Sequence, residues 1–136
     1  MPLELDEART LIAATLAHGR EMGIRIAAAV VDEGGHLQAL ERMDGAFPLS
    51  SQVAEAKAVG AAMWHRDGAS LAAIQAERPA FYERVDSLVR MPMMPGMGSA
   101  LIRRGDRILG AIGVSGAMSE QDLECANAGL SALLGS

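Results

Sequence analysis

The stretch IRIAAAVVDEGGHLQALERM, from Ile24 to Met43, decides the fold. Its first part, residues 24–32, is rich in alanine and β-branched residues and predicts a mostly buried strand. Gly34 and Gly35 can both adopt positive φ, which a tight turn requires. Residues 36–43 then alternate apolar and polar side chains, as a returning strand does. The stretch therefore predicts a β-hairpin.

A second hairpin is predicted near the end of the chain. Residues 100–104 and 107–115 read as strands joined by the turn Gly105-Asp106. Gly110 and Gly113 interrupt the last strand, which indicates that another element packs closely against it.

Helices are predicted before, between and after the hairpins. Gly23 ends the first, Ser50 or Ser51 caps the second, Ser70 caps the third, and Ser119 caps the last with Asp122 three residues on. The expected helices cover residues 4–22, about 50–66, about 70–77, 79 to about 90, and a final helix from 119. Residues 91–98 contain two prolines and two glycines and are expected to be irregular.

The resulting order is α-β-β-α-α-α-β-β-α. Two hairpins separated by helices favour a single α+β domain over residues 1–136, in which helices pack on one antiparallel sheet. A chain of 136 residues is long enough for one domain with a real core and too short for two ordinary ones.

Composition narrows the classes of function. The net charge of −5 makes a nucleic-acid-binding surface unexpected. Cys125 is the sole cysteine, so no intrachain disulfide is possible, which fits a reducing, cytoplasmic location. The acidic N-terminal residues do not resemble a signal peptide, and no apolar stretch is long enough to span a membrane. Aromatic residues make up 3% of the chain and the mean hydropathy is +0.17, so we expect a homo-oligomer that hides apolar surface.

Chemically useful residues gather around the predicted strand-to-helix crossing after the first hairpin. Lys57 lies beside the apolar stripe of the second helix, where it could clamp a carboxylate, form a Schiff base, or simply pair with a nearby acid. Asp44 could orient Lys57 or a ligand, or close an Asx turn before Gly45. Arg42 is either a partner for a carboxylate or propionate, or an ordinary arginine at a strand end.

Histidine and methionine offer a further set of candidates. His65 could ligate haem iron or stabilise the end of its helix. The methionines of residues 91–97 favour packing or a pocket wall over a soft-metal site, because no other ligand type is interleaved with them. The histidine spacings match no zinc motif, so no metal site is expected.

Four segments together resemble the GlcG/HbpS family, also described as haem-degrading or PduO C-terminal-like. The matching segments are Val30-Val31-Asp32-Glu33-Gly34-Gly35-His36-Leu37, Arg42-Met43-Asp44-Gly45-Ala46, Ser51-x-x-Ala54-x-x-Lys57-Ala58 and Gly110-Ala111-Ile112-Gly113-Val114-Ser115-Gly116-Ala117. The resemblance implies a profilin-like domain that assembles into dimers or larger rings, with some relatives binding haem or corrinoid-related ligands. It places the ligand neighbourhood at Arg42, Asp44, Lys57 and the glycine-rich loop before the third strand.

The first hypothesis for function is therefore a small-ligand-binding protein, with haem or a related tetrapyrrole as ligand. Its expected ligand contacts are Arg42, Met43, Gly45, His65, Met94, Gly96, Met97 and Gly98. The alternative is a small catabolic hydrolase, tautomerase or decarboxylase acting on an organic acid or aldehyde, with Lys57 and Asp44 as catalytic groups and Arg42 as carboxylate clamp. A third hypothesis is an accessory oligomer with no ligand.

Overall fold

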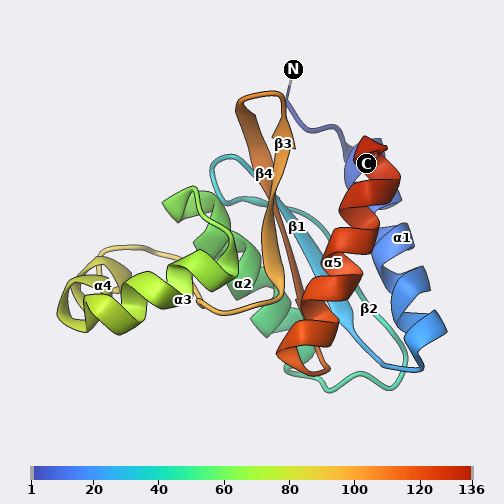
Figure 1. The fold of residues 1–136 in the computed structure, drawn as a ribbon, viewed down its shortest axis with the longest axis horizontal. Coiled ribbons are helices and arrows are strands. Elements are labelled where there is room, and N and C mark those ends of the chain that lie inside the picture. The colour runs from blue at the N-terminus through green and yellow to red at the C-terminus, as the bar shows by residue number, and fades with distance from the viewer. Residues whose placement is uncertain (1, 136) are drawn as a thin grey trace.

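The computed structural model describes residues 2–135, which form five helices and four strands (Figure 1). The elements follow the predicted order. They are α1 Leu5–Met22, β1 Ala27–Asp32, β2 Leu37–Arg42, α2 Ser50–Trp64, α3 Gly68–Glu77, α4 Pro79–Asp86, β3 Ser99–Arg104, β4 Arg107–Ser115 and α5 Ser119–Leu134.

The four strands form one antiparallel sheet in the order β2-β1-β4-β3. The two hairpins are joined through β1 and β4, whose register runs from Ala27 opposite Ser115 to Asp32 opposite Gly110. The prediction of an α+β domain built on two hairpins is thus confirmed. The two edge strands are β2 and β3, one from each hairpin.

Helices cover both faces of the sheet (Figure 1). Alternate residues of β1 divide between them, as the period of a strand requires. Ala28 and Val30 pack toward α1 and α5, together with residues such as Leu11 and Cys125. Val31 faces the other way and packs with Ala58 of α2. The sheet is therefore the central layer between α2 and the α1–α5 pair.

Two glycines of β4 allow backbone to approach backbone. A Cβ at Gly113 would lie 2.1 Å from the carbonyl oxygen of Ala54 in α2. A Cβ at Gly110 would lie 2.1 Å from the carbonyl oxygen of Val31, and Gly110 has a φ of 155°. The close packing that these glycines indicated in the sequence is confirmed: Gly110 meets the neighbouring strand β1, and Gly113 lets α2 lie directly on the sheet.

The turn of the first hairpin is held by Asp32. Its Oδ1 accepts hydrogen bonds from the backbone N–H of Gly34 at 2.9 Å and of His36 at 3.0 Å. Burial opposes ionisation of this carboxyl, but these donors and the His36 ring outweigh it, so the pKa of Asp32 is lowered. The Gly-Gly turn is thus reinforced by the residue that precedes it.

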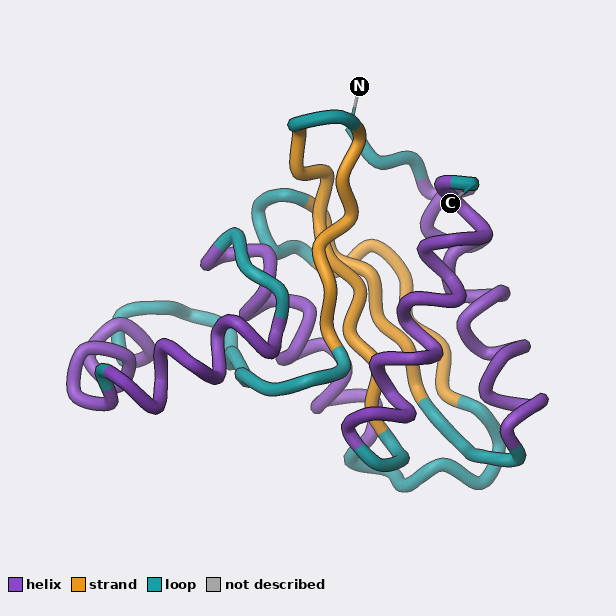
Figure 2. The backbone as a smooth tube through the Cα atoms, viewed as in Figure 1, coloured by secondary structure: helices purple, strands orange, loops and turns teal. Residues whose placement is uncertain are grey.

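Helices α3 and α4 extend away from the sheet, and the chain returns from them through an irregular segment (Figure 2). Trp64 at the end of α2 stacks on Tyr82 of α4, with ring centroids 5.6 Å apart, and this contact anchors the extension. The returning segment runs along α2, where the N–H of Met94 donates to the carbonyl of Ala56 at 3.0 Å. Residues 91–98 contain no helix or strand, as predicted.

Several predicted helix starts are wrong by one to three residues. Leu49, not a serine, occupies the N-cap position of α2, and Asp67 precedes α3, so neither Ser50 nor Ser70 is a cap. The α5 helix begins after Met118, whose N–H donates to the Gln121 side chain at 3.1 Å. Helix α4 ends at Asp86 rather than near residue 90. The N-cap positions of α2 and α3 carry no side-chain capping hydrogen bond, so the serines nearby did not mark where these helices start.

None of the helices between residues 2 and 135 combines the length and apolar character that crossing a membrane requires.

The contact at Gly113 can be tested by adding one methyl group. Gly113→Ala should lower the free energy of unfolding by an amount near the upper end of the range of about 1–3 kcal/mol that overpacking costs. The loss should be large because the backbone atoms of α2 cannot move aside as a side chain can. Gly19→Ala in α1 is the matched control, since its Cβ would meet only side-chain atoms, those of Ile26 and Met43. Urea denaturation of both variants measures the difference, and equal losses would contradict the proposed packing.

Candidate functional site

Lys57 is buried in the structure, with 7% of its surface exposed. Its Nζ donates to the carbonyl oxygen of Val114 in β4 at 3.0 Å and to Oδ2 of Asp122 in α5 at 3.4 Å. Because α2 and α5 cover opposite faces of the sheet, this ion pair connects the two helical layers. Of the roles considered for Lys57, the structure shows pairing with a nearby acid, and that acid is Asp122.

The loop before β3 closes over this ion pair. A Cβ at Gly98 would lie 2.7 Å from Lys57 Nζ and 2.8 Å from the Val114 oxygen, and Gly98 has a φ of 115°. Its carbonyl accepts a hydrogen bond from the N–H of Val114 at 2.7 Å. A side chain at Gly98 would displace the ammonium, so glycine is required here by both space and conformation.

Asp122 is as deeply buried as its partner. Burial raises the pKa of its carboxyl, while the Lys57 charge and the N–H of Ala117, which donates to Oδ1 at 3.1 Å, act in the opposite direction. The carboxylate therefore depends on Lys57 to remain ionised inside the protein. The ammonium is in turn held by two acceptors, which opposes a nucleophilic role for this amine.

Arg42, Met43, Asp44 and Gly45 lie elsewhere, around the end of β2. Arg42, Met43 and Asp44 line a hollow of about 260 Å³ beside the end of α1. Arg42 Nη1 donates to the carbonyl of Ala46 at 3.0 Å, whereas Met43 is buried in the core with 7% of its surface exposed.

The expected grouping of Lys57 with Arg42 and Asp44 is therefore wrong. Within residues 2–135, no hydrogen bond or ion pair joins Lys57 to either residue, and Lys57 does not line their hollow. Residues that flank one strand-to-helix crossing in the sequence do not share a hollow here. In the structure, Lys57 reaches past β4 toward α5, whereas Arg42 and Asp44 stay at the end of β2.

The remaining predicted site residues surround the outer side of α2. His65 follows α2 in a left-handed conformation, with φ of 55°, and is exposed. Met94 and Met97 are partly exposed, at 39% and 38%. Gly96 donates its N–H to the carbonyl of Gly68 at 3.0 Å, which ties the loop to the start of α3.

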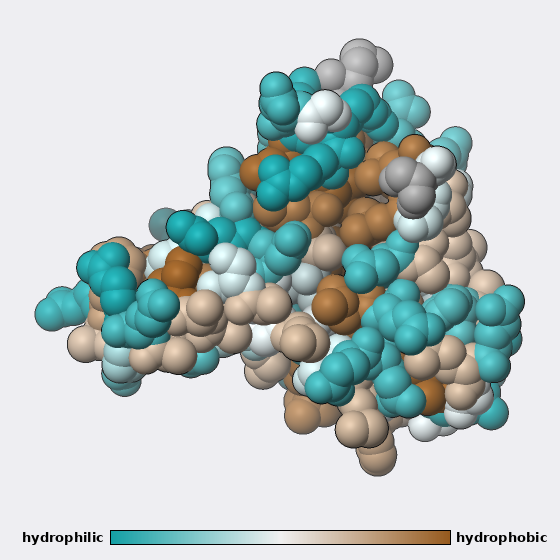
Figure 3. Space-filling view, viewed as in Figure 1, coloured by the Kyte–Doolittle hydropathy of each residue, from teal (hydrophilic) through white to brown (hydrophobic). Residues whose placement is uncertain are grey.

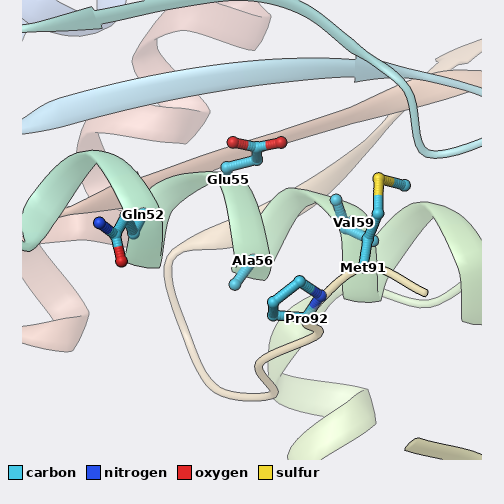
Figure 4. Close-up of a pocket in the computed structure, with 6 residues that line it drawn as sticks. All are labelled: Gln52, Glu55, Ala56, Val59, Met91 and Pro92. Carbon is cyan, nitrogen blue, oxygen red and sulfur yellow. The ribbon is translucent and has the colours of Figure 1, made fainter. Parts of the chain in front are cut away.

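A largely apolar groove runs between α2 and the segment 88–92, and we call it the α2 groove. Its two compartments measure about 160 and 290 Å³ and share Val59 and Met91. The smaller is also lined by Gln52, Glu55, Ala56 and Pro92, the larger by Met63, Leu88, Val89 and Arg90. Figure 4 shows Ala56 pointing toward Pro92 across the smaller compartment, while Glu55 points the other way.

The sequence predicts few of the residues that line the α2 groove. It identified the methionine-rich segment as a pocket wall, and Met91 does line both compartments. Arg90 was missed because residue 90 was placed at the end of a helix, and nothing in the apolar pattern of α2 marked Val59 as a groove residue. The signal available was the apolar pair Leu88-Val89 just before the irregular segment.

These features define an α+β domain in which a central antiparallel sheet carries α2 on one face and a groove on the outer side of that helix. The sequence model of the family described as "Haem degrading protein HbpS-like" matches residues 3–131. The chain belongs to the HbpS-like family, which confirms the resemblance read from the sequence.

Individual relatives agree with this assignment. The chain is 31% identical to Protein GlcG of Escherichia coli strain K12 over 118 residues, covering 83% of this chain and 81% of that protein. A double mutant of HbpS from Streptomyces reticuli superposes with a TM-score of 0.86 at 27% identity, covering 96% of this chain and 86% of that one. A PduOC–haem complex has the same fold, with a TM-score of 0.86, 22% identity and coverage of 97% and 95%.

The Lys57–Asp122 pair can be tested by removing one charge and then both. Lys57→Met leaves a buried carboxylate without a counter-charge and should lower the free energy of unfolding by about 3–5 kcal/mol. Adding Asp122→Asn to this variant removes the unpaired charge but keeps an acceptor for the Ala117 N–H, so part of the loss should be recovered. Urea denaturation of the three proteins measures both steps.

The same variant has a predicted pH dependence. Without Lys57 the folded-state pKa of Asp122 rises further above its unfolded value, so the folded state binds the proton more tightly. Lys57→Met should therefore be most stable in mild acid and lose stability as the pH rises through that pKa. A loss that does not change with pH, and that Asp122→Asn does not reduce, would contradict the pairing.

Proposed function

We propose that this protein binds haem or a related tetrapyrrole in the α2 groove. The observation that carries the proposal is an apolar groove with an arginine among its lining residues, in a chain of the HbpS-like family. The fold shared with a PduOC–haem complex supports it further, since that architecture accommodates the ligand in at least one other protein.

The size of the groove favours a flat ligand that spans both compartments. Small-molecule sites usually occupy about 300–1,000 Å³, and neither compartment alone exceeds the lower end of that range. Val59 and Met91 lie where the compartments meet, so a planar macrocycle would rest on them. Thioether side chains adapt well to such irregular apolar surfaces.

Charges at the groove give a bound tetrapyrrole an orientation. Arg90 lines the larger compartment and suits a propionate, because guanidinium groups bind carboxylates through paired hydrogen bonds. Glu55 borders the smaller compartment, but its carboxylate points away from Pro92, so that compartment offers a propionate no positive partner (Figure 4). The acidic edge of the ligand therefore belongs at the Arg90 side.

Three side chains near the groove can supply an axial ligand to iron. Met63 lines the larger compartment and Met91 lines both, and each carries a thioether. His65 follows two residues after Met63 and is exposed. A bound haem would supply the iron chemistry, and these residues would position it.

The segment 94–98 holds one wall of the groove in place. Met94 is tied to α2 by its hydrogen bond to Ala56, and Gly96 to the start of α3 by its bond to Gly68. Gly98 follows and packs on the buried Lys57. We propose that Met94 and Met97, which remain partly exposed, contribute to the ligand-binding surface at this wall.

The alternative of a catabolic enzyme requires Lys57, Asp44 and Arg42 at one site. Lys57 Nζ is engaged by Val114 and Asp122 instead, so no observation favours that scheme.

We also propose that the chain forms homo-oligomers through an apolar patch around the start of α2. Phe47, Leu49 and Met118 are 73%, 63% and 68% exposed. Phe47 and Leu49 line a hollow of about 300 Å³ with Val53 and Ala117. Apolar residues are visible at the lower end of the molecule, below the starts of α2 and α5 (Figure 3). Exposed apolar clusters of this kind often mark interaction surfaces.

Titration with hemin tests the haem proposal. The wild-type protein should produce a saturable Soret band, and Gln52→Trp should weaken binding at least about tenfold, because Gln52 is exposed and lines the smaller compartment, where the indole would occupy ligand space. Thr10→Trp adds the same side chain to an exposed position of α1, on the other face of the sheet, and should bind as wild type does. His65→Ala and Met91→Leu should identify the iron ligand by a shift in the Soret maximum.

Two results would overturn this proposal. A flat titration would remove haem as the ligand, and unchanged binding by Gln52→Trp would remove the α2 groove as the site.

Sedimentation velocity tests the assembly. Leu49→Glu places a charge in the apolar patch and should shift the protein toward the monomer, whereas Leu37→Glu, at an isolated exposed leucine of β2, should leave the oligomer intact. A monomeric wild-type protein, or an oligomer that tolerates Leu49→Glu, would contradict this interface.

A further inference from the structure

The hollow at the end of β2 gathers three arginines from three segments. Arg20 comes from the last turn of α1, Arg25 from the loop before β1, and Arg42 from the end of β2, and all three line a space of about 260 Å³. It lies beside α1, on the other side of the sheet from the α2 groove. The two sites are therefore separate, and this inference does not depend on the proposed haem binding.

Backbone contacts hold these segments together. The N–H of Met43, next to Arg42, donates to the carbonyl of Ile26, next to Arg25, at 2.9 Å. The side chain of Arg25 lies over Gly45, with its Cγ and Cδ 3.8 Å from the position that a Cβ would occupy there. Arg42 is fixed by its hydrogen bond to Ala46. Two of the three guanidinium groups are thus positioned by the fold.

None of the three arginines is neutralised by an acid within the described chain. Two other arginines are neutralised in this way: Arg104 pairs with Glu7, and Arg107 pairs with Glu33. Within residues 2–135, no carboxylate lies within ion-pair distance of Arg20, Arg25 or Arg42. Glu41 and Asp44 also line the hollow, yet neither closes on a guanidinium.

We infer that this hollow binds a compact oxyanion, such as a phosphate group or the carboxylate of a small organic acid. A guanidinium offers paired N–H donors that match carboxylate and phosphate oxygens. Against the two carboxylates of Glu41 and Asp44, the three guanidinium groups leave the lining with an excess of positive charge, in a chain whose net charge is −5. Glu41 and Asp44, which also line the hollow, can accept hydrogen bonds from hydroxyl groups of the ligand.

Calorimetric titration at constant ionic strength tests this inference, with inorganic phosphate and citrate as the two probes. At least one should bind with one-to-one stoichiometry, and Arg20→Gln and Arg25→Gln should each weaken binding about tenfold or more, the loss of a charge-assisted contact. Binding of phosphate alone identifies a phosphate-bearing ligand, and binding of citrate alone identifies a carboxylate ligand.

Arg103→Gln provides the matched control, because Arg103 is an exposed arginine on β3, away from the hollow. It should leave the affinity unchanged. The inference is overturned if neither probe shows saturable binding. It is also overturned if Arg103→Gln weakens binding as much as Arg25→Gln does. The loss of affinity would then reflect the overall charge of the protein and not contacts in the hollow.

Discussion

The structure depends on the close contact between the backbone of α2 and strand β4 at Gly113. At Gly113 the carbonyl of Ala54 occupies the space that a side chain would fill, so α2 lies against the sheet almost without intervening atoms. This closeness lets Lys57 reach past β4 to Asp122. It also leaves the outer side of α2, with Val59, free to form a groove with the segment that returns from α4.

The two helical layers are joined by a charge pair inside a largely apolar interior. Isolated buried charges are costly, so Lys57 and Asp122 are each tolerated only in the presence of the other. Gly98 makes this arrangement possible by bringing the loop before β3 over the ammonium without adding a side chain. The methionine-rich segment that ends at Gly98 is consequently placed by the same buried pair that joins α2 to α5.

The fold could be predicted from the sequence in more detail than the site. The Gly34-Gly35 and Gly105-Asp106 turns predicted both hairpins, and Gly110 and Gly113 predicted close packing, because these are local constraints on the backbone. Predicting the site would have required knowing the direction in which each side chain points. The sequence placed Lys57 near Arg42 and Asp44 in the chain, but only the arrangement of layers shows that its ammonium points to Asp122, 65 residues later. The grouping of Arg20 and Arg25 with Arg42 was not predicted, for the same reason. It arises when segments that are separate in the sequence come together in the fold.

Lys57 is the sole lysine of the chain, and its Nζ lies in the interior between α2 and α5. The folded protein consequently exposes no lysine amine on its surface. Reagents that label or cross-link lysines, and enzymes that acetylate or ubiquitinate them, have no accessible lysine target while the domain stays folded. Reaction at Lys57 would report opening of the domain.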